Sequence, residues 1–323
     1  MTDYRQLLAC SDAELGRVDP LVMNLLVAKS IPSLADLDIA RYQRLADQWA
    51  EGIRSRLPRA ERVFQKTPGD WKNDVRFLRL AVLCEYVDRD LGIKYREDQR
   101  DLAAVSYTDP ADLFLNGVMD TRQGTCGNMS MLHVALGWRL GWPVSLACVS
   151  SHQICRFDDG QVTYNIEATQ TGIGGFKAPP DAYYIEEYGL TAKAISSGSD
   201  LRAVTPRELL GIFVGFRGRH MRDTGRWAEA EPDYLLARHL FPSNRKLYIN
   251  ATGVSVRRSV ERFERDEEGS PASLAGWLAE DYGSVGRPLP GRAVERRVNL
   301  PLPDTLKHYS GLAIIVQAMR SGK

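Results

Sequence analysis

Residues 124–169 constrain the fold more than any other segment, because their hydrophobic period changes from helical to strand-like within a short distance. After Cys126, apolar residues recur at helical spacing at Met129, Leu132, Leu136 and Leu140. Three β-rich runs then follow, at residues 144–150, 152–157 and 162–168. This order predicts an α+β core in which one helix packs on an antiparallel sheet.

The connection between the last two runs predicts how they pair. Residues 158–161 contain Asp159-Gly160, a strong signal for a two-residue type I′ turn. Paired residues then have numbers that sum to 158 + 161 = 319, so His152 faces Glu167. Asn165 lies on the same face as Glu167, because side chains alternate along a strand.

Cys126 is predicted to begin the helix. Free amide groups and the helix dipole favour a thiolate at such a position. Gly124 and Gly127 flank the cysteine, so we expect a substrate backbone to approach it closely, and the amide of Cys126 or a neighbour is a candidate oxyanion donor. Gln123 is a possible supporting residue that orients substrate, although an ordinary polar loop residue is the simpler interpretation.

Cysteine, imidazole and carboxylate in this order are the parts of a thiol-nucleophile enzyme. Glu167 would accept a proton from one imidazole nitrogen of His152 and leave the other nitrogen facing Cys126. Asn165 is the alternative partner for the imidazole. The competing interpretations are a structural histidine and a cysteine that serves as a small core residue.

The segment resembles the transglutaminase-like superfamily, a papain-like group with a Gly-x-Cys-Gly helix, a histidine strand and an acidic strand. Gly124-Thr125-Cys126-Gly127 matches the nucleophile box, and residues 136–144, LGWRLGWPV, resemble the family's LxxxLGxPv helix-to-strand turn. His152 matches the family histidine. Ile166-Glu167-Ala168-Thr169 stands where the family usually has Asp followed by Pro-Thr, so this chain departs from the pattern with a longer carboxylate.

Two further features accompany the resemblance. The gap from Cys126 to His152, 152 − 126 = 26 residues, is shorter than in many members and indicates a compact core. Residues 83–89 and the segment from Leu201 also look like bacterial transglutaminase-like proteins.

The resemblance implies a papain-like α+β core with helical flanks and an enzyme that transfers the acyl group of an amide through a thioester. Water as acceptor would make it a peptidase or deamidase, and an amine would make it a transglutaminase. The expected substrate is a protein or peptide.

Two alternatives come from other classes of function. In the first, the core is a non-catalytic scaffold, and the C-terminal helices hold a protein partner. In the second, Cys126 is a redox sensor that requires Cys148 or Cys155 as resolving thiol, although Cys155 faces away from His152 in the predicted hairpin.

The remaining cysteines and histidines favour structural roles. His133 is predicted to be a packed or surface helix residue, and His220 to lie on a solvated helix face. Neither Cys-x-x-Cys nor His-x-x-x-His spacing occurs, and no calcium-loop pattern appears, so we expect no metal and no cofactor. Cys10, Cys84, Cys148 and Cys155 are predicted core residues.

Composition excludes several classes of protein. The net charge of +1 argues against a nucleic-acid or acidic-membrane partner, and no apolar run is long enough to span a membrane. The N-terminus lacks a signal-peptide pattern, and five irregularly spaced cysteines fit a reduced cytoplasm. We therefore expect a cytoplasmic protein.

The 323 residues divide into four predicted regions. These are a helical N-terminal region (1–108), the catalytic core (109–200), a tetratricopeptide-like helical hairpin (201–248, with helices in 206–242) and a C-terminal helical or linker region (249–323). Further expectations are a capping box at 11–14, helices at 34–57, 71–91 and 303–319, a glycine-rich loop at 169–180, and a groove walled by Tyr183, Tyr184 and Tyr188.

Overall fold

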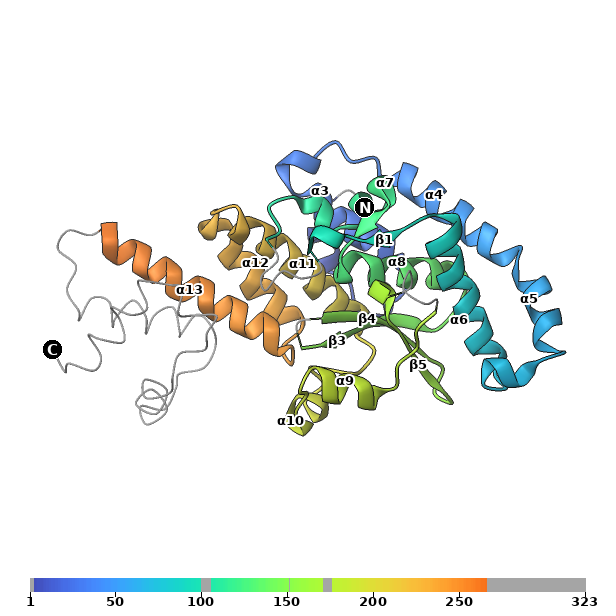
Figure 1. Cartoon of the computed structure of the whole chain (residues 1–323). Coiled ribbons are helices and arrows are strands. Elements are labelled where there is room, and N and C mark those ends of the chain that lie inside the picture. The colour runs from blue at the N-terminus through green and yellow to red at the C-terminus, as the bar shows by residue number, and fades with distance from the viewer. Residues whose placement is uncertain (1–2, 100–105, 151, 171–175, 266–323) are drawn as a thin grey trace.

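The computed structural model describes residues 3–99, 106–150, 152–170 and 176–265. Its centre is helix α8 (Cys126–Arg139), whose residues from Gly127 to Gly137 are all buried. A three-stranded sheet packs against one side of α8, and helices α3, α4 and α6 contact it from other sides (Figure 1). The predicted α+β class, with a helix packed on an antiparallel sheet, is confirmed.

The other α-helices precede or follow α8 in the sequence. They are α1 (Arg5–Leu8), α2 (Asp12–Leu15), α3 (Pro20–Lys29), α4 (Ile39–Arg54), α5 (Leu57–Phe64), α6 (Val75–Glu85), α7 (Leu115–Thr121), α9 (Asp181–Glu187), α10 (Ala192–Ser196), α11 (Pro206–Asp223), α12 (Trp227–Leu240) and α13 (Arg245–Arg265). Shorter helical turns are η1 (Pro32–Leu34), η2 (Pro68–Trp71), η3 (Tyr86–Asp90), η4 (Glu97–Gln99), η5 (Pro110–Asp112) and η6 (Ala168–Gln170).

The main sheet is antiparallel, in the order β3 (Val144–Val149), β4 (His152–Asp158) and β5 (Thr163–Ile166). One face packs on α8, and the other face carries α9 and α10 through a smaller apolar cluster around Tyr184. A separate parallel pair joins β1 (Lys94–Tyr95) to β2 (Gln123–Gly124), immediately before Cys126.

The predicted register of β4 and β5 is wrong by two residues. Asp158 pairs with Thr163, so the numbers of paired residues sum to 158 + 163 = 321, and four residues form the turn. Asp159 explains the longer turn, because its Oδ1 accepts hydrogen bonds from the amides of Gln161 and Val162 at 3.0 and 2.9 Å. Arg76 of α6 binds its other carboxylate oxygen at 2.7 Å.

A shift of two residues leaves every side chain on its predicted face. Continuing the observed register past the end of β5 places Glu167 opposite Ile154, since 321 − 167 = 154. Glu167 is therefore a diagonal neighbour of His152 rather than its direct partner. Asn165 pairs with Arg156, whereas the predicted sum of 319 would have placed it opposite residue 319 − 165 = 154.

The glycines of the 136–144 run explain the turn from α8 into β3. A Cβ at Gly137 would lie 2.6 Å from Val144 Cγ2, so only glycine lets the strand return along the helix. Gly141 ends the helix with φ +75°, a conformation that side chains disfavour.

The predicted N-terminal helices form with shorter bounds. Asp38 caps α4 through its hydrogen bond from the Arg41 amide, so the helix begins after residue 34. The predicted helix at 71–91 becomes α6, which continues as the single π-helical turn η3. The capping box at Ser11 and Glu14 is confirmed.

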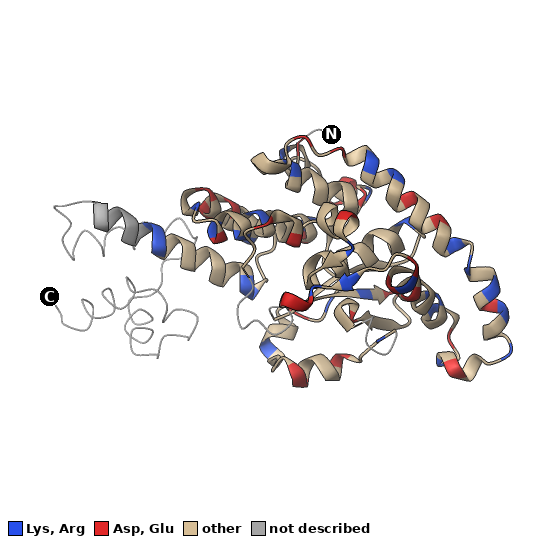
Figure 2. Cartoon of the chain, turned by 45° about the horizontal axis from the view of Figure 1, so that its top comes forward, with Lys and Arg blue, Asp and Glu red and all other residues tan. Residues whose placement is uncertain are grey.

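Acidic and basic residues are intermixed along the outer helices rather than gathered by sign (Figure 2). Arg54 pairs with Glu51 on α4, and Arg56 pairs with Asp90 of η3. These are exposed ion pairs, which contribute little to stability individually.

Helices α11 and α12 form the predicted hairpin, and α13 packs against α12. The predicted helix at 303–319 and part of the 169–180 loop lie outside the described residues. Within the described residues, no helix has the length and apolar character needed to cross a membrane. The four predicted domain boundaries stay predictions.

Substituting Gly117→Ala should destabilise the fold, because a Cβ there would lie 1.9 Å from the carbonyl oxygen of Ala111. We expect the free energy of unfolding to fall by about 3 kcal/mol. Urea denaturation measures this. Gly69→Ala is the matched control, because a Cβ there meets nothing within 4 Å. Equal stability of the two variants would contradict the packing described here.

Candidate active site

Cys126 is the first residue of α8 and is half-buried. The first backbone hydrogen bond of the helix runs from the Met129 amide to the Thr125 carbonyl at 3.1 Å. The amides of Cys126 and Gly127 come before this bond, so the helix itself supplies no acceptor for them. Cys126 therefore stands at the N-terminus of the helix, as the sequence predicted.

His152 begins β4, and its Nε2 lies 2.9 and 3.1 Å from the two carboxylate oxygens of Glu167. Its side chain is 12% exposed and that of Glu167 is 1% exposed, so little water competes for this contact. Because Glu167 occupies Nε2, Nδ1 is the imidazole nitrogen that remains for Cys126. The structure thus pairs His152 with Glu167, and Cys126 lies close enough to the imidazole to raise the pKa of His152.

Burial disfavours a charged imidazole, but the neighbouring Cys126 and then Glu167 outweigh it and raise the pKa of His152 to about 10. Burial also opposes ionisation of Glu167, but its hydrogen bond and charge interaction with His152 lower the pKa of the carboxyl below its ordinary value. Both shifts favour an imidazolium paired with a carboxylate.

The two pKa shifts determine the pH range in which this pair stabilises the fold. The raised pKa of His152 contributes stability that is complete below its ordinary value of 6.5 and is lost as the pH rises through about 10. The lowered pKa of Glu167 contributes stability above its ordinary value of 4.5, which is lost as the pH falls.

Glu167 has two further partners that fix its position. The Thr169 hydroxyl donates to its Oε1 at 2.6 Å, and the buried Tyr184 hydroxyl of α9 lies 3.3 Å from its Oε2. Glu167 lies just beyond β5 and reaches His152 diagonally across the sheet.

Asn165 does not contact His152, so the alternative that it orients the imidazole is wrong. Its Oδ1 accepts from Arg156 at 2.8 Å, and its Nδ2 donates to Asp181 at 2.7 Å. Because Arg156 opposes it in the observed register, Asn165 belongs to a buried polar cluster that joins the sheet to α9.

Gly124 and Gly127 are closely packed against other side chains, and the approach of a substrate backbone beside them stays a prediction. A Cβ at Gly124 would lie 2.5 Å from Met129 Cγ. A Cβ at Gly127 would lie 3.0 Å from both Gln153 Oε1 and Phe216 Cζ. The protein's own side chains therefore occupy the space beside each glycine.

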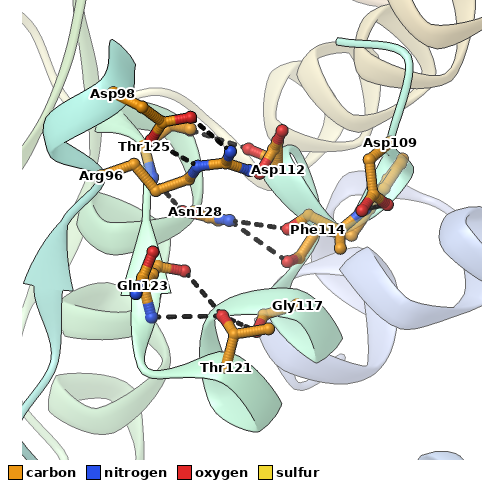
Figure 3. Close-up of polar contacts among 11 residues, drawn as sticks. Arg96, Asp98, Asp109, Asp112, Phe114, Gly117, Thr121, Gln123, Thr125 and Asn128 are labelled. Carbon is orange, nitrogen blue, oxygen red and sulfur yellow. Dashed lines mark hydrogen bonds and ion pairs between the residues drawn. The ribbon is translucent and has the colours of Figure 1, made fainter. Parts of the chain in front are cut away.

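A network of polar contacts supports the turn that precedes Cys126 (Figure 3). Buried Asn128 accepts from the Thr125 amide at 2.8 Å and donates to the Ala111 carbonyl at 3.1 Å. The Thr125 hydroxyl donates to the Asp112 carbonyl at 2.8 Å, and the Asp112 carboxylate pairs with Arg96. Neither Asn128 nor Arg96 was identified from the sequence.

Gln123 is exposed in β2. The backbone N–H of Gln123 donates to the Thr121 hydroxyl at 3.1 Å, and that hydroxyl donates to the backbone carbonyl of Gln123 at 3.0 Å (Figure 3). These contacts shape the turn, and the supporting role of its side chain toward a substrate stays a prediction.

Two tyrosines complete the surroundings of the site. The ring of Tyr188 stacks on His152, with centroids 5.4 Å apart and planes at 6°. Tyr107 is held from α11, because Asp223 accepts from its amide at 3.0 Å and His220 contacts its carbonyl at 3.2 Å. Burial, followed by the nearby Cys126, raises the pKa of Tyr107. The sequence indicated Tyr188 as a groove residue but gave no signal for Tyr107.

His220 is buried, so its predicted place on a solvated helix face is wrong; its contact with Tyr107 explains the burial. His133 is buried as well, with Nδ1 2.8 Å from the Met129 carbonyl, and burial lowers its pKa.

The remaining thiols fit the predicted core role. Cys84, Cys148 and Cys155 are buried, and burial raises the pKa of each. Cys10 is half-buried. Across the described part of the chain, no three His, Cys, Asp or Glu side chains form a group that would bind a metal ion.

Replacing Asn128→Ala should destabilise the protein, because the Thr125 amide and the Ala111 and Phe114 carbonyls lose the side chain that binds them. We expect a loss of about 1–3 kcal/mol in the free energy of unfolding, measured in urea. The control is Gln123→Ala, an exposed residue three positions before the cysteine. If the control lost as much free energy of unfolding as the Asn128 variant, the loss could not be attributed to the hydrogen bonds of Asn128.

Replacing Glu167→Gln should lower the pKa of His152, because it removes the carboxylate that favours the imidazolium. A fall of about 1–3 units is expected for the loss of a nearby opposite charge. An NMR titration of the histidine ring, assigned with His152→Ala, measures it. Glu187→Gln, on the exposed side of α9, should leave the midpoint unchanged. An unchanged midpoint in Glu167→Gln would rule out this account.

Comparison with known proteins identifies a family. The family model Transglut_core2, described as the transglutaminase-like superfamily, matches residues 40–214, which is 214 − 40 + 1 = 175 of 323 residues. No curated protein matches the chain. A solved structure titled "Crystal structure of menin reveals the binding site for Mixed Lineage Leukemia (MLL) protein" is similar at 12% identity and a TM-score of 0.34, over 94% of this chain and 79% of that chain.

Proposed function

We propose, for a chain that belongs to the transglutaminase-like superfamily, the function of a cysteine-dependent enzyme that acts on amide bonds through an acyl-thioester. The observation that carries this proposal is the contact of His152 Nε2 with buried Glu167, which leaves Nδ1 for Cys126. A structural histidine would not need both a buried carboxylate and a neighbouring half-buried thiol.

The first step forms the thioester. The Cys126 thiolate attacks the amide carbonyl carbon, and the C–S bond forms as the oxygen becomes an oxyanion. The helix-terminal amides of Cys126 and Gly127 are the candidate donors to that oxygen. The imidazolium of His152 gives its Nδ1 proton to the departing nitrogen as the C–N bond breaks.

The second step releases the acyl group. Neutral His152 takes a proton from the acceptor, which attacks the thioester carbonyl, and the C–S bond breaks to regenerate the thiolate. With water the product is a carboxylic acid, as in a peptidase or deamidase. With an amine it is a new amide, as in a transglutaminase.

Glu167 has a defined part in both steps. It accepts a hydrogen bond from Nε2–H, so it fixes the ring and leaves Nδ1 available for proton transfer through each change of charge. Thr169 and Tyr184 hold its oxygens in place. The expected substrate is a protein or peptide, because the reacting group is an amide.

The test is the pH dependence of iodoacetamide alkylation at Cys126, read by mass spectrometry of the labelled peptide. A preformed thiolate–imidazolium pair should keep the rate high down to about pH 5–6, and His152→Ala should abolish this. His239→Ala, an exposed histidine of α12, is the matched control and should behave as wild type.

A rate that follows an ordinary thiol in wild type and is unchanged in His152→Ala would contradict the proposal and favour the scaffold alternative. If the pair is present, peptide mixtures incubated with wild type and Cys126→Ala distinguish the acceptor. Cleavage, deamidation and amine incorporation each give a different mass change.

A further inference from the structure

The ring of Tyr188 lies nearly parallel to the imidazole of His152. The centroids are 5.4 Å apart and the planes differ by 6°. Tyr188 is half-buried and packs with the apolar cluster on the outer face of the sheet. One face of the imidazole is therefore covered by an aromatic ring.

Helix α9 holds this ring from a fixed position. At its N-terminus, Asp181 binds Arg156 at 2.8 Å and Asn165 at 2.7 Å, which joins the helix to β4 and β5. At its C-terminus, the Tyr188 amide donates to the Tyr184 carbonyl at 3.1 Å. Gly189 follows with φ +58°, so the chain turns away directly after Tyr188.

The same helix also reaches the carboxylate. The Tyr184 hydroxyl contacts Glu167 Oε2 at 3.3 Å, and the rings of Tyr184 and Tyr188 stack with centroids 6.1 Å apart. His152 thus has three neighbours from three parts of the chain, which are Cys126 of α8, Glu167 after β5 and Tyr188 at the end of α9.

We propose that Tyr188 is a positioning residue for His152, which holds the plane of the imidazole and keeps water from its contact with Glu167. This inference rests on the proposed function, because it assigns the ring to the partner of Cys126. The aromatic face, which carries partial negative charge, stabilises an imidazolium placed over it.

The test compares Tyr188→Leu and Tyr188→Phe with Tyr183→Leu. Phe keeps the stacked ring and removes only the hydroxyl, whereas Leu removes the ring. Tyr183 is the matched control, since it is a half-buried tyrosine of α9 whose ring contacts Tyr184 at 5.1 Å instead of His152. The readout is the rate of Cys126 alkylation by iodoacetamide between pH 5 and 10, with folding checked by circular dichroism.

Tyr188→Leu should slow alkylation at pH 6 by about fivefold, the scale of one cation–π contact, and narrow the pH range of fast reaction. Tyr188→Phe and Tyr183→Leu should stay within about twofold of wild type, since neither loses that contact. A Phe variant as slow as the Leu variant would overturn the proposal, because the ring face would then not be what acts. A folded Leu variant with the wild-type profile would overturn it too.

The two proposals fail in different ways. If wild type itself reacts as an ordinary thiol that is insensitive to His152→Ala, the proposed function fails. If wild type shows the ion pair and Tyr188→Leu leaves it unchanged, only the role of Tyr188 fails. Should Tyr188→Leu not fold, Tyr188→Met takes its place, because the flexible thioether also removes the ring and adapts to the space that the ring leaves.

Discussion

The burial of α8 is the constraint on which the rest of the structure depends. A helix that is buried from Gly127 to Gly137 has no solvent face over that length, so it must be covered by a sheet on one side and by helices on the others. That enclosure fixes the place where its N-terminus emerges, and with it the half-buried Cys126. Strand β4 of the covering sheet begins next to this end of α8. The packing of the sheet on the helix therefore brings the strand that starts with His152 beside Cys126.

The contact between His152 and Glu167 was predictable although the register that led to it was wrong. Strand alternation assigns both side chains to one face, and a shift of two residues preserves that assignment. Strand alternation does not predict the length of the turn. The Asp159 carboxylate, which binds turn amides and Arg76, stabilises a four-residue turn instead of the expected two-residue turn. The predicted strand partner of Asn165 was wrong for the same reason, because the observed register places it opposite Arg156.

The residues that the sequence did not indicate share one property, which is that distant segments hold them in place. Tyr107 is held by α11, more than a hundred positions later, and Asn128 binds carbonyls from the 111–114 turn. Local period and propensity carry no information on such contacts. The neighbours of the flanking glycines were equally hidden, since only the fold shows that Phe216 and Met129 fill the space beside them.

The contacts of α11 have a consequence for how small a working fragment of this protein could be made. The family match ends at residue 214, yet Phe216, His220 and Asp223 lie beyond it and touch Gly127 or hold Tyr107. On the other side, α3 packs on α8 although it precedes residue 40. A fragment cut at residues 40 and 214 would leave the helix that carries the thiol without part of the packing that covers it. A fragment that keeps these contacts therefore needs α3 and α11 in addition to the matched residues, and α12 with them, because α12 packs on α11.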